Sequence, residues 1–140
     1  MKDKIDILNQ LRAKAELGGG EARIKAQHDK GKNTARERIN LLLDENSFVE
    51  IDRFTSNSDN AIPGDSVIVG TGTINGKNIC VYSQDFTVMG GSLSKVAADK
   101  ICKIIELNQS NQCHYMFCLP IYIYNLKIIL KFLKYFFLFD

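Results

Sequence analysis

The sequence predicts a mixed α/β domain in which helices come first, a short β-meander follows and a further helix comes after it. Three observations predict this order. Apolar residues recur at three- and four-residue steps before Asp44, as on one face of a helix. Residues 66–83 alternate as two strands around Asn75 and Gly76, and helical periodicity returns from about residue 93. This order of elements fits both the α/β and the α+β class.

Length and composition describe one ordinary globular domain. The chain has 140 residues, of which 45% are hydrophobic and 24% charged, and its net charge is +2. That charge is too small to indicate nucleic acid or an anionic surface as a partner. No apolar signal stretch follows Met1, and the four cysteines are not spaced as a disulfide framework. We therefore expect a reducing compartment, either the cytoplasm or, as the alternative, the mitochondrial matrix.

Three helices are predicted before the first strand. Residues 3–17 form the first helix, which three glycines end, and residues 21–30 form a charged second helix with Ile24 and Ala26 as its apolar contacts. Thr34 and Glu37 fit a capping box at the start of the third helix. The residues expected to face the core from the first and third helices are Ile5, Leu8, Leu11, Ala15, Ile39, Leu42 and Leu43.

The β-meander is predicted from alternation and from one turn signal. Residues 47–52 form a short strand, and residues 53–65 form a polar loop. The strand at 66–74 places Val67, Val69, Thr71 and Thr73 on one side, and the return strand runs over 77–83. Asn-Gly at 75–76 joins the two, because both positions tolerate positive φ.

The segment around Gly90 and Gly91 is the candidate site. Two adjacent glycines let a backbone approach a ligand closely or adopt positive φ, and a helix N-terminus behind them would present unpaired N–H groups. These features predict a site for a carbonyl oxygen or a phosphate; the alternative is a tight strand-to-helix turn without a ligand. The helix behind this segment is expected over 93–107, with a buried stripe of Val96, Ala97, Ile101, Ile104 and Ile105.

Three blocks of sequence together resemble a known family. They are residues 30–39 (Lys-Gly-Lys-Asn-Thr-Ala-Arg-Glu-Arg-Ile), the stretch 63–76 that begins Pro-Gly-Asp-Ser-Val, and residues 83–92 (Ser-Gln-Asp-Phe-Thr-Val-Met-Gly-Gly-Ser). In this order they are similar to the start of the carboxyltransferase subunit of biotin-dependent acyl-CoA carboxylases, the family of propionyl-CoA carboxylase β chains and methylmalonyl-CoA decarboxylase subunits. The resemblance covers residues 1–108.

The resemblance implies a crotonase-like fold of repeated ββα units, here the N-terminal domain preceded by helices. It implies transfer of a carboxyl group between biotin and the α-carbon of a short-chain acyl-CoA such as propionyl-CoA. Biotin would be carried on a partner protein or domain, and a biotin carboxylase or carrier subunit, acyl-CoA and further copies of the chain would be the partners. The family stabilises oxyanions with backbone N–H groups and needs no protein nucleophile.

The resemblance also assigns candidate site residues. The thioester pocket would be lined within 86–92, and CoA phosphates would meet basic side chains near the third helix. The alternative for those basic residues is a solvated helix face or subunit contacts. Asp85 fits a general base or a structural turn residue, and we expect the turn role because Asp bonds its own backbone in turns. The substrate-binding candidates are Phe86, Gly90, Gly91, Ser92, Lys32, Arg36 and Arg38.

Residues 109–140 are expected to be unrelated to the family. After Ala98 the chain contains no Ala, Gly, Val, Arg or Thr. This change of composition predicts a truncated carboxyltransferase followed by a frameshift or intron read-through, which sequencing the transcript tests. The alternative to an enzyme part is a catalytically dead fragment, acting as a subunit-interaction or membrane-associated remnant. We expect no acyl-CoA-dependent carboxylation by the purified chain alone.

The last part of the chain was weighed for a membrane and for a metal. Residues 119–139 are long enough to span a bilayer, but three lysines within them nearly cancel the gain from the apolar residues. An interfacial amphipathic helix and an aggregation-prone tail are the remaining alternatives. Cys113, His114 and Cys118 offer only three ligands, so no metal site is predicted.

Overall fold

A computed structural model describes residues 1–58, 61–110 and 115–119, with side chains up to residue 110. The elements in order are α1 (Lys2–Leu17), α2 (Glu21–Asp29), α3 (Ala35–Leu42), β1 (Val49–Ile51), β2 (Val67–Ile74), β3 (Lys77–Gln84), the 3₁₀ turn η1 (Met89–Gly91), α4 (Lys95–Gln109) and β4 (Tyr115–Leu119). The described strands form one sheet in the order β1-β2-β3-β4. The β1–β2 and β2–β3 pairs are antiparallel, and β4 lies parallel to β3 after the crossover through α4.

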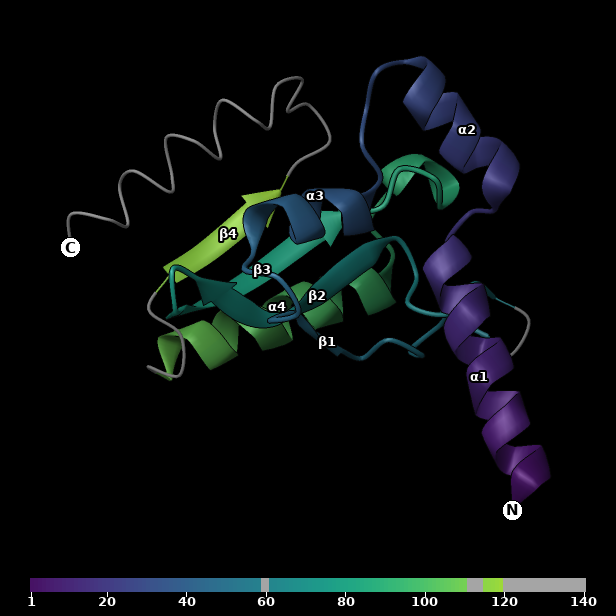
Figure 1. The fold of residues 1–140 in the computed structure, drawn as a ribbon, viewed down its shortest axis with the longest axis horizontal. Coiled ribbons are helices and arrows are strands. Elements are labelled where there is room, and N and C mark those ends of the chain that lie inside the picture. The colour runs from purple at the N-terminus through teal and green to yellow at the C-terminus, as the bar shows by residue number, and fades with distance from the viewer. Residues whose placement is uncertain (59–60, 111–114, 120–140) are drawn as a thin grey trace.

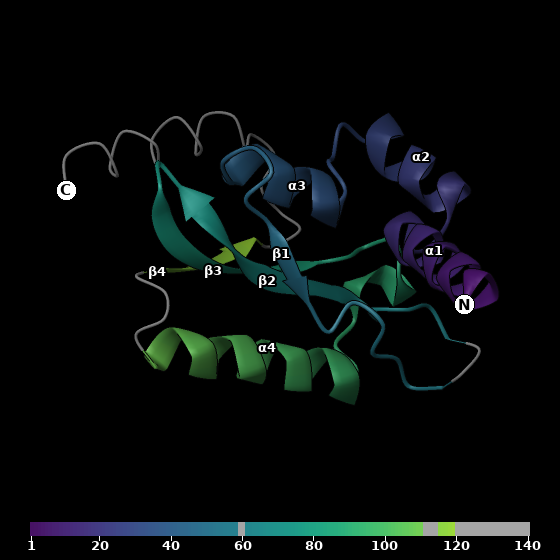
Figure 2. The same ribbon diagram turned by 60° about the horizontal axis from the view of Figure 1, so that its bottom comes forward.

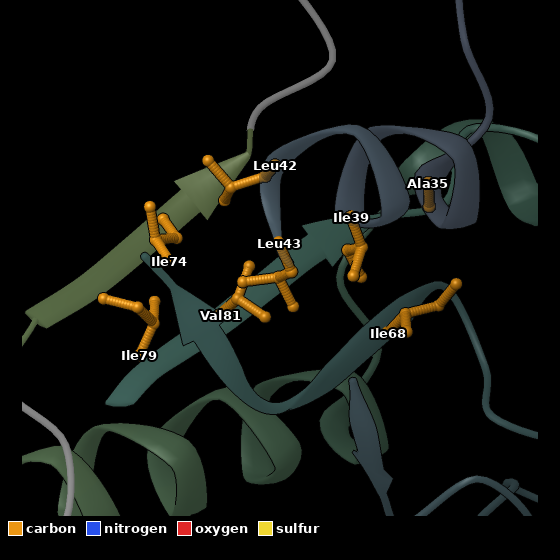
Figure 3. Packing of buried hydrophobic residues seen from close by; sticks show 8 residues of the cluster. All are labelled: Ala35, Ile39, Leu42, Leu43, Ile68, Ile74, Ile79 and Val81. Atoms are coloured by element: carbon orange, nitrogen blue, oxygen red, sulfur yellow. The ribbon is translucent and has the colours of Figure 1, made fainter. Parts of the chain in front are cut away.

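The sheet lies between two helices, and this arrangement buries β2 on both of its faces. Figure 2 shows α3 above the sheet and α4 below it. On the α3 side, Ile39 and Leu42 pack with Ile68, Ile79 and Val81 of β2 and β3 (Figure 3). On the other side, Val67, Val69 and Cys80 pack with Ala97 and Ile104 of α4. Alternation placed Val67, Val69, Thr71 and Thr73 on one side of this strand, and the structure buries residues of both sides because a helix covers each face.

Two glycines in β2 allow the layer above the sheet to pack closely. A Cβ added at Gly70 would lie 2.6 Å from Cε2 of Phe48 and 2.3 Å from the Val49 carbonyl oxygen. A Cβ at Gly72 would lie 2.5 Å from Cδ1 of Leu43. Glycine at both positions therefore gives Phe48 and Leu43 direct contact with the backbone of β2.

The predicted hairpin and the predicted capping box are both confirmed. Asn75 and Gly76 have φ values of 49° and 78°. Their N–H groups donate to the carboxylate of Asp44 over 3.0 and 2.9 Å, so the loop after α3 holds the turn. Thr34 accepts a hydrogen bond from the N–H of Glu37, whose carboxylate accepts one from the N–H of Thr34.

Three expectations about individual side chains are wrong, two about burial and one about a disulfide. Of the predicted inward residues of α1 only Ala15 is buried, whereas Ile5 and Leu11 are 53% and 40% exposed, because the helix extends away from the sheet (Figure 1). In α2 the buried residue is Gln27, and Ala26 is exposed. Cys80 is disulfide-bonded, contrary to the expectation of free cysteines.

The membrane expectation concerns residues that largely lie outside the described part of the chain. Among the described helices, none combines the length and apolarity needed to cross a bilayer. The tail after Leu119, with its three lysines, is not described, so its interfacial and aggregation-prone alternatives stay predictions.

The close packing at Gly70 predicts that one added methyl group strongly lowers the stability of the fold. Gly70→Ala is expected to lower the free energy of unfolding by about 2–3 kcal/mol, because Phe48 and β1 must move to admit the new Cβ. Urea denaturation measures this change. Thr71→Val on the same strand keeps the side-chain volume at a half-buried position and is expected to stay within about 0.5 kcal/mol of the native chain. Equal stabilities of the two variants would contradict this account.

Candidate functional site

The three sequence blocks meet at one end of the β2–β3 hairpin. Because these strands are antiparallel, Val67 at the start of β2 pairs with Gln84 at the end of β3. The loop before β2 and the loop after β3 therefore leave the sheet side by side. The first block reaches the same place from α3, which covers this end of the sheet (Figure 2).

Arg38 joins α3 to the end of β3. Its side chain is buried, and its guanidinium donates from Nε and Nη2 to the Ser83 hydroxyl over 3.2 and 2.9 Å. Nη2 also donates to the carbonyl of Gln84. Hydrogen bonds from a charged donor are strong, so this contact fixes where β3 ends. Arg38 was expected to bind CoA phosphates or, as the alternative, to lie on a solvated helix face. Its buried position differs from both expectations.

Ser66 connects the loop before β2 to the loop after β3. Its hydroxyl donates to the carbonyl of Ser92 over 2.6 Å, and its carbonyl accepts from the N–H of Asp85 over 2.7 Å. Its own N–H donates to the carboxylate of Asp65 over 2.6 Å. Ser66 is fully buried, so both ends of the segment 85–92 are held from inside the protein.

Asp85 is a structural turn residue, as expected. Its Oδ1 accepts hydrogen bonds from the N–H and the hydroxyl of Thr87 over 2.9 and 2.6 Å. The Asp85 carbonyl accepts from the N–H of Val88 over 3.2 Å. A carboxylate that caps its own turn in this way orders the backbone rather than taking protons from a substrate.

The glycine segment forms a left-handed turn and not the start of the helix. Met89, Gly90 and Gly91 have φ values of 46°, 62° and 75°. The N–H groups of Gly91 and Ser92 donate back to the carbonyls of Val88 and Met89, over 2.8 and 3.2 Å. The helix was expected to open at residues 90–92 and run from about residue 93. It begins at Lys95, with Ser94 as N-cap, because Ser92 is extended.

Gly90 is the exposed point of this turn. Gly91 is buried, whereas Gly90 is exposed and a Cβ built on it meets no atom within 4 Å. Open space beside a backbone without a side chain is what a ligand needs for close approach. The hydroxyl of Ser92 faces back to the Met89 carbonyl over 2.9 Å, so it stabilises the turn.

Lys32 and Phe86, both predicted site residues, are brought together. The Nζ of Lys32 lies 5.9 Å from the centre of the Phe86 ring, at the outer limit of a cation–π contact. The N–H of Lys32 donates to the carbonyl of Gln27 over 3.0 Å, which ties its loop to α2. Phe86 is half-buried, so one part of the ring remains open to solvent beside the turn.

Arg36 lies in a separate ionic cluster. It donates twice to the carboxylate of Glu50, over 2.7 and 3.1 Å, and Arg53 donates to the same carboxylate over 2.7 Å. The Glu50 side chain is only 3% exposed, so the two guanidinium groups neutralise a buried charge. Both arginines border a cavity of about 880 Å³ between α3 and β1, and no residue of 85–92 lines it.

Lys100 is a buried charged residue that the sequence interpretation missed. Its Nζ donates to the carbonyls of Gly64 and Val67 over 2.7 and 2.6 Å, which fastens the loop before β2 to α4. Burial lowers the pKa of Lys100 to about 8, against the opposing effect of the Glu50 carboxylate. The spacing of Lys100 from Ala97 and Ile104 places it on the apolar stripe of α4, a signal that was present in the sequence.

The chemistry that the described residues offer around 85–92 is that of backbone groups, an aromatic ring and an ammonium group. Among residues 1–58 and 61–110, no three His, Cys, Asp or Glu side chains lie together as a metal site would require. Cys113 and His114 lie outside the described residues. The segment instead offers an exposed glycine backbone, an aromatic ring and a lysine, a set suited to holding a large anionic ligand.

Comparison with known proteins identifies close relatives by sequence. A family model of the carboxyl transferase domain matches residues 26–123. The propionyl-CoA carboxylase beta chain of Roseobacter denitrificans is 51% identical over an alignment of 118 residues, and the match covers 79% of this chain and 23% of that protein. The human mitochondrial propionyl-CoA carboxylase beta chain is 56% identical over an alignment of 108 residues, and the match covers 71% of this chain and 20% of that protein. The chain thus spans a fifth to a quarter of these relatives' length.

Solved structures similar to this chain also include proteins that, by name, transfer carboxyl groups. The transcarboxylase 12S hexamer, solved with methylmalonyl-coenzyme A and methylmalonic acid bound, superposes with a TM-score of 0.77 at 34% identity. The match covers 98% of this chain and 29% of that one. A single-chain long-chain acyl-CoA carboxylase shares the fold at 23% identity with a TM-score of 0.72. The expected crotonase-like architecture is thereby confirmed, with β2, β3 and α4 as its ββα unit.

The buried position of Arg38 predicts a structural role for its guanidinium. Arg38→Met is expected to lower the free energy of unfolding by about 2–3 kcal/mol, because the Ser83 hydroxyl and the Gln84 carbonyl lose a charged donor. Arg12→Met, on the exposed surface of α1, is the matched control and should leave stability unchanged. Urea denaturation compares the two, and an unchanged midpoint for Arg38→Met would contradict the role.

The lowered pKa of Lys100 predicts a pH dependence of stability. Its folded-state pKa of about 8 lies below the ordinary value of 10.5, so between these values the unfolded chain binds more protons and unfolding becomes less favourable as pH rises. The neutral amine keeps two N–H groups for its two carbonyl partners. Relative to Lys100→Met, the native chain is expected to gain roughly 2 kcal/mol between pH 7 and 9.5. Denaturation of both proteins at each pH measures this gain, and a constant difference would refute it.

Proposed function

The chain belongs to the carboxyl transferase domain family, and we propose that it supplies the acyl-CoA side of a carboxyltransferase. The enzyme would move a carboxyl group between biotin and the α-carbon of a short-chain acyl-CoA such as propionyl-CoA. Three described features support this role: the exposed Gly90 backbone, the half-buried Phe86 ring, and Lys32 beside that ring. The relatives named propionyl-CoA carboxylase beta chain and the CoA-bound transcarboxylase 12S support the substrate class.

The single observation that carries the proposal is the open space beside Gly90. The turn around it is held by Ser66, Asp85 and the amides of Gly91 and Ser92, so its shape does not depend on a ligand. A preformed turn loses little conformational entropy when a thioester lies against it. Gly90 itself makes no close packing that would explain a glycine, although its φ of 62° favours one.

In this proposal the residues bind and orient the substrate without attacking it. The thioester would lie along the backbone of Gly90 and Gly91, with Phe86 against the apolar part and Lys32 toward the anionic part of CoA. Arg36 and Arg38, expected as phosphate ligands, would act indirectly by holding β1 and β3 in place. Ser92 would act through the Met89 carbonyl and through Ser66.

Biotin would come from a partner protein or domain. Neither the cavity between α3 and β1 nor a second one bordered by residues of β1, β2 and β3 and by Leu107 is lined by the turn at 85–92. We assign none of the described residues to biotin. A biotin carrier and further copies of the chain are the partners we propose, in agreement with the hexamer of transcarboxylase 12S.

We also propose that the family part of the chain extends beyond residue 108. The family match runs to residue 123, and β4 pairs with β3 in parallel register from Ile79 and Tyr115. A strand that follows α4 and returns to the same sheet is what a ββα repeat requires. The change of composition after Ala98 would then begin within the family part of the chain. A frameshift or intron read-through would begin after residue 123 and not after residue 108.

The second candidate function is association with an intact subunit. The apolar residues of α1 support it, since Ile5 and Ile7 are 53% and 56% exposed and Leu11 is 40% exposed. Exposed apolar side chains on a helix that extends away from the sheet are typical of a contact between subunits. For the compartment we propose the cytoplasm or, as the alternative, the mitochondrial matrix, which the name of the human relative supports.

Gly90 and Gly76 form a matched pair for testing the acyl-CoA role. Both have positive φ and open space around the missing Cβ, but they lie at opposite ends of β3. Alanine at either position is expected to cost about 1 kcal/mol of stability, because its Cβ disfavours positive φ. Only Gly90→Ala is expected to weaken binding of propionyl-CoA, by about tenfold, because the methyl group enters the space beside the turn.

Isothermal titration with propionyl-CoA and with free CoA measures these affinities. A loss for propionyl-CoA that exceeds the loss for free CoA would place the thioester beside Gly90. Equal affinities for the Gly76 and Gly90 variants would refute the proposed site. If the native chain binds neither compound but co-purifies with an intact subunit, the association function is supported instead.

A further inference from the structure

We propose that α2, with the glycine loop before it (residues 18–20), positions the turn at residues 85–92, which we call the substrate turn. Gly19 and Arg23 hold Thr87 and thereby set the backbone of residues 88–91. This inference rests on the proposed acyl-CoA role of the turn. In Figures 1 and 2 the short green turn η1 lies beside the corner where α1 meets α2.

Thr87 is the residue through which this contact passes. The N–H of Gly19 donates to the Thr87 hydroxyl oxygen over 2.9 Å, and Nη1 of Arg23 donates to the Thr87 carbonyl over 3.0 Å. The Thr87 hydroxyl in turn donates to Asp85 over 2.6 Å. Thr87 is 2% exposed, so its hydroxyl and its carbonyl take their donors from α2 and the loop before it.

The glycine loop is shaped for this contact. A Cβ at Gly19 would lie 1.7 Å from the carbonyl oxygen of Thr87, and one at Gly18 would lie 2.6 Å from Oδ2 of Asp85. At Gly19 the obstacle is backbone, so no side chain fits unless the backbone moves; at Gly18 the obstacles are the side chains of Asp85 and Thr87, and a φ of 49° adds strain. The three glycines were predicted only to end α1. Two of them also let the α1–α2 corner lie directly on the substrate turn.

The contact is close enough in sequence to govern the glycine turn. Thr87 precedes Val88, whose carbonyl accepts the N–H of Gly91 over 2.8 Å. A rotation of the Thr87 peptide would therefore move the acceptor that keeps Gly91 left-handed. Beyond the other end of α2, the loop with Lys32 is tied to Gln27 and places its ammonium over Phe86. The helix thus reaches the turn from both of its ends.

Arg23 is the residue that can be changed without disturbing the core. It lies on the exposed side of α2, and Lys25 on the same helix is the matched control, since its ammonium pairs with the exposed Asp29 over 2.8 Å. The test compares Arg23→Met, Arg23→Lys and Lys25→Met with the native chain. Three quantities are measured: hydrogen exchange of the Gly91 amide without ligand, the Kd for propionyl-CoA, and the Tm.

Arg23→Met is expected to speed exchange of the Gly91 amide and to weaken propionyl-CoA binding, each by about tenfold, the effect of losing one charged hydrogen bond. The Tm is expected to fall by a few degrees, because the same lost hydrogen bond also stabilises the folded state against unfolding. Lys25→Met is expected to keep native exchange, binding and Tm. Arg23→Lys keeps a charged donor and is expected to restore part of both losses.

Each contrary result has its own meaning. Native exchange at Gly91 in Arg23→Met would overturn the positioning role, even if binding weakened, because Arg23 would then contact the ligand directly. If Arg23→Lys restored the native Kd for propionyl-CoA while its Gly91 amide still exchanged as fast as in Arg23→Met, the positioning role would be overturned for the same reason. If exchange rises but the native chain binds no propionyl-CoA, the proposed function fails, and the role of α2 in binding fails with it.

Discussion

The rest of the structure depends on how the end of β3 is held. A buried guanidinium on α3, that of Arg38, donates to Ser83 and Gln84 at the last two positions of the strand. Its position requires the helix to lie flat on the sheet, which Ile39 and Leu42 ensure by packing on Val81 and its neighbours. Once β3 ends there, the backbone must turn at Asp85, and the glycine segment follows at a defined place.

Around that point, polar side chains bind backbone and leave few groups for covalent chemistry. Ser66 bonds the carbonyl of Ser92, Asp85 caps its own turn, and Lys100 bonds two carbonyls of the loop before β2. Because loops lack their own ladders of hydrogen bonds, such side chains must supply the partners. The result is a turn held by internal hydrogen bonds with an exposed glycine, and the proposed acyl-CoA site rests on this arrangement.

Local features of the fold were predictable, and features that depend on neighbours were less so. The capping box at Thr34 and the hairpin at Asn75 are complete within a few residues, so their signals were sufficient. The apolar face of α1 had the same periodicity as that of α4, yet only α4 packs on the sheet. Periodicity states which face is apolar, but whether a partner lies against that face depends on distant parts of the chain.

For the site, the sequence by itself determined that residues 86–92 form a glycine turn after a strand, and that Asp85 belongs to the turn. Only the tertiary structure decided that Arg38 is buried, that Arg36 serves Glu50, and that Gly19 and Arg23 reach Thr87 across more than sixty residues of chain. The physical reason is that a charged or glycine residue has no fixed preference for its partner. Its role follows from which backbone atoms the fold brings within hydrogen-bond distance, and residues distant in sequence supply those atoms.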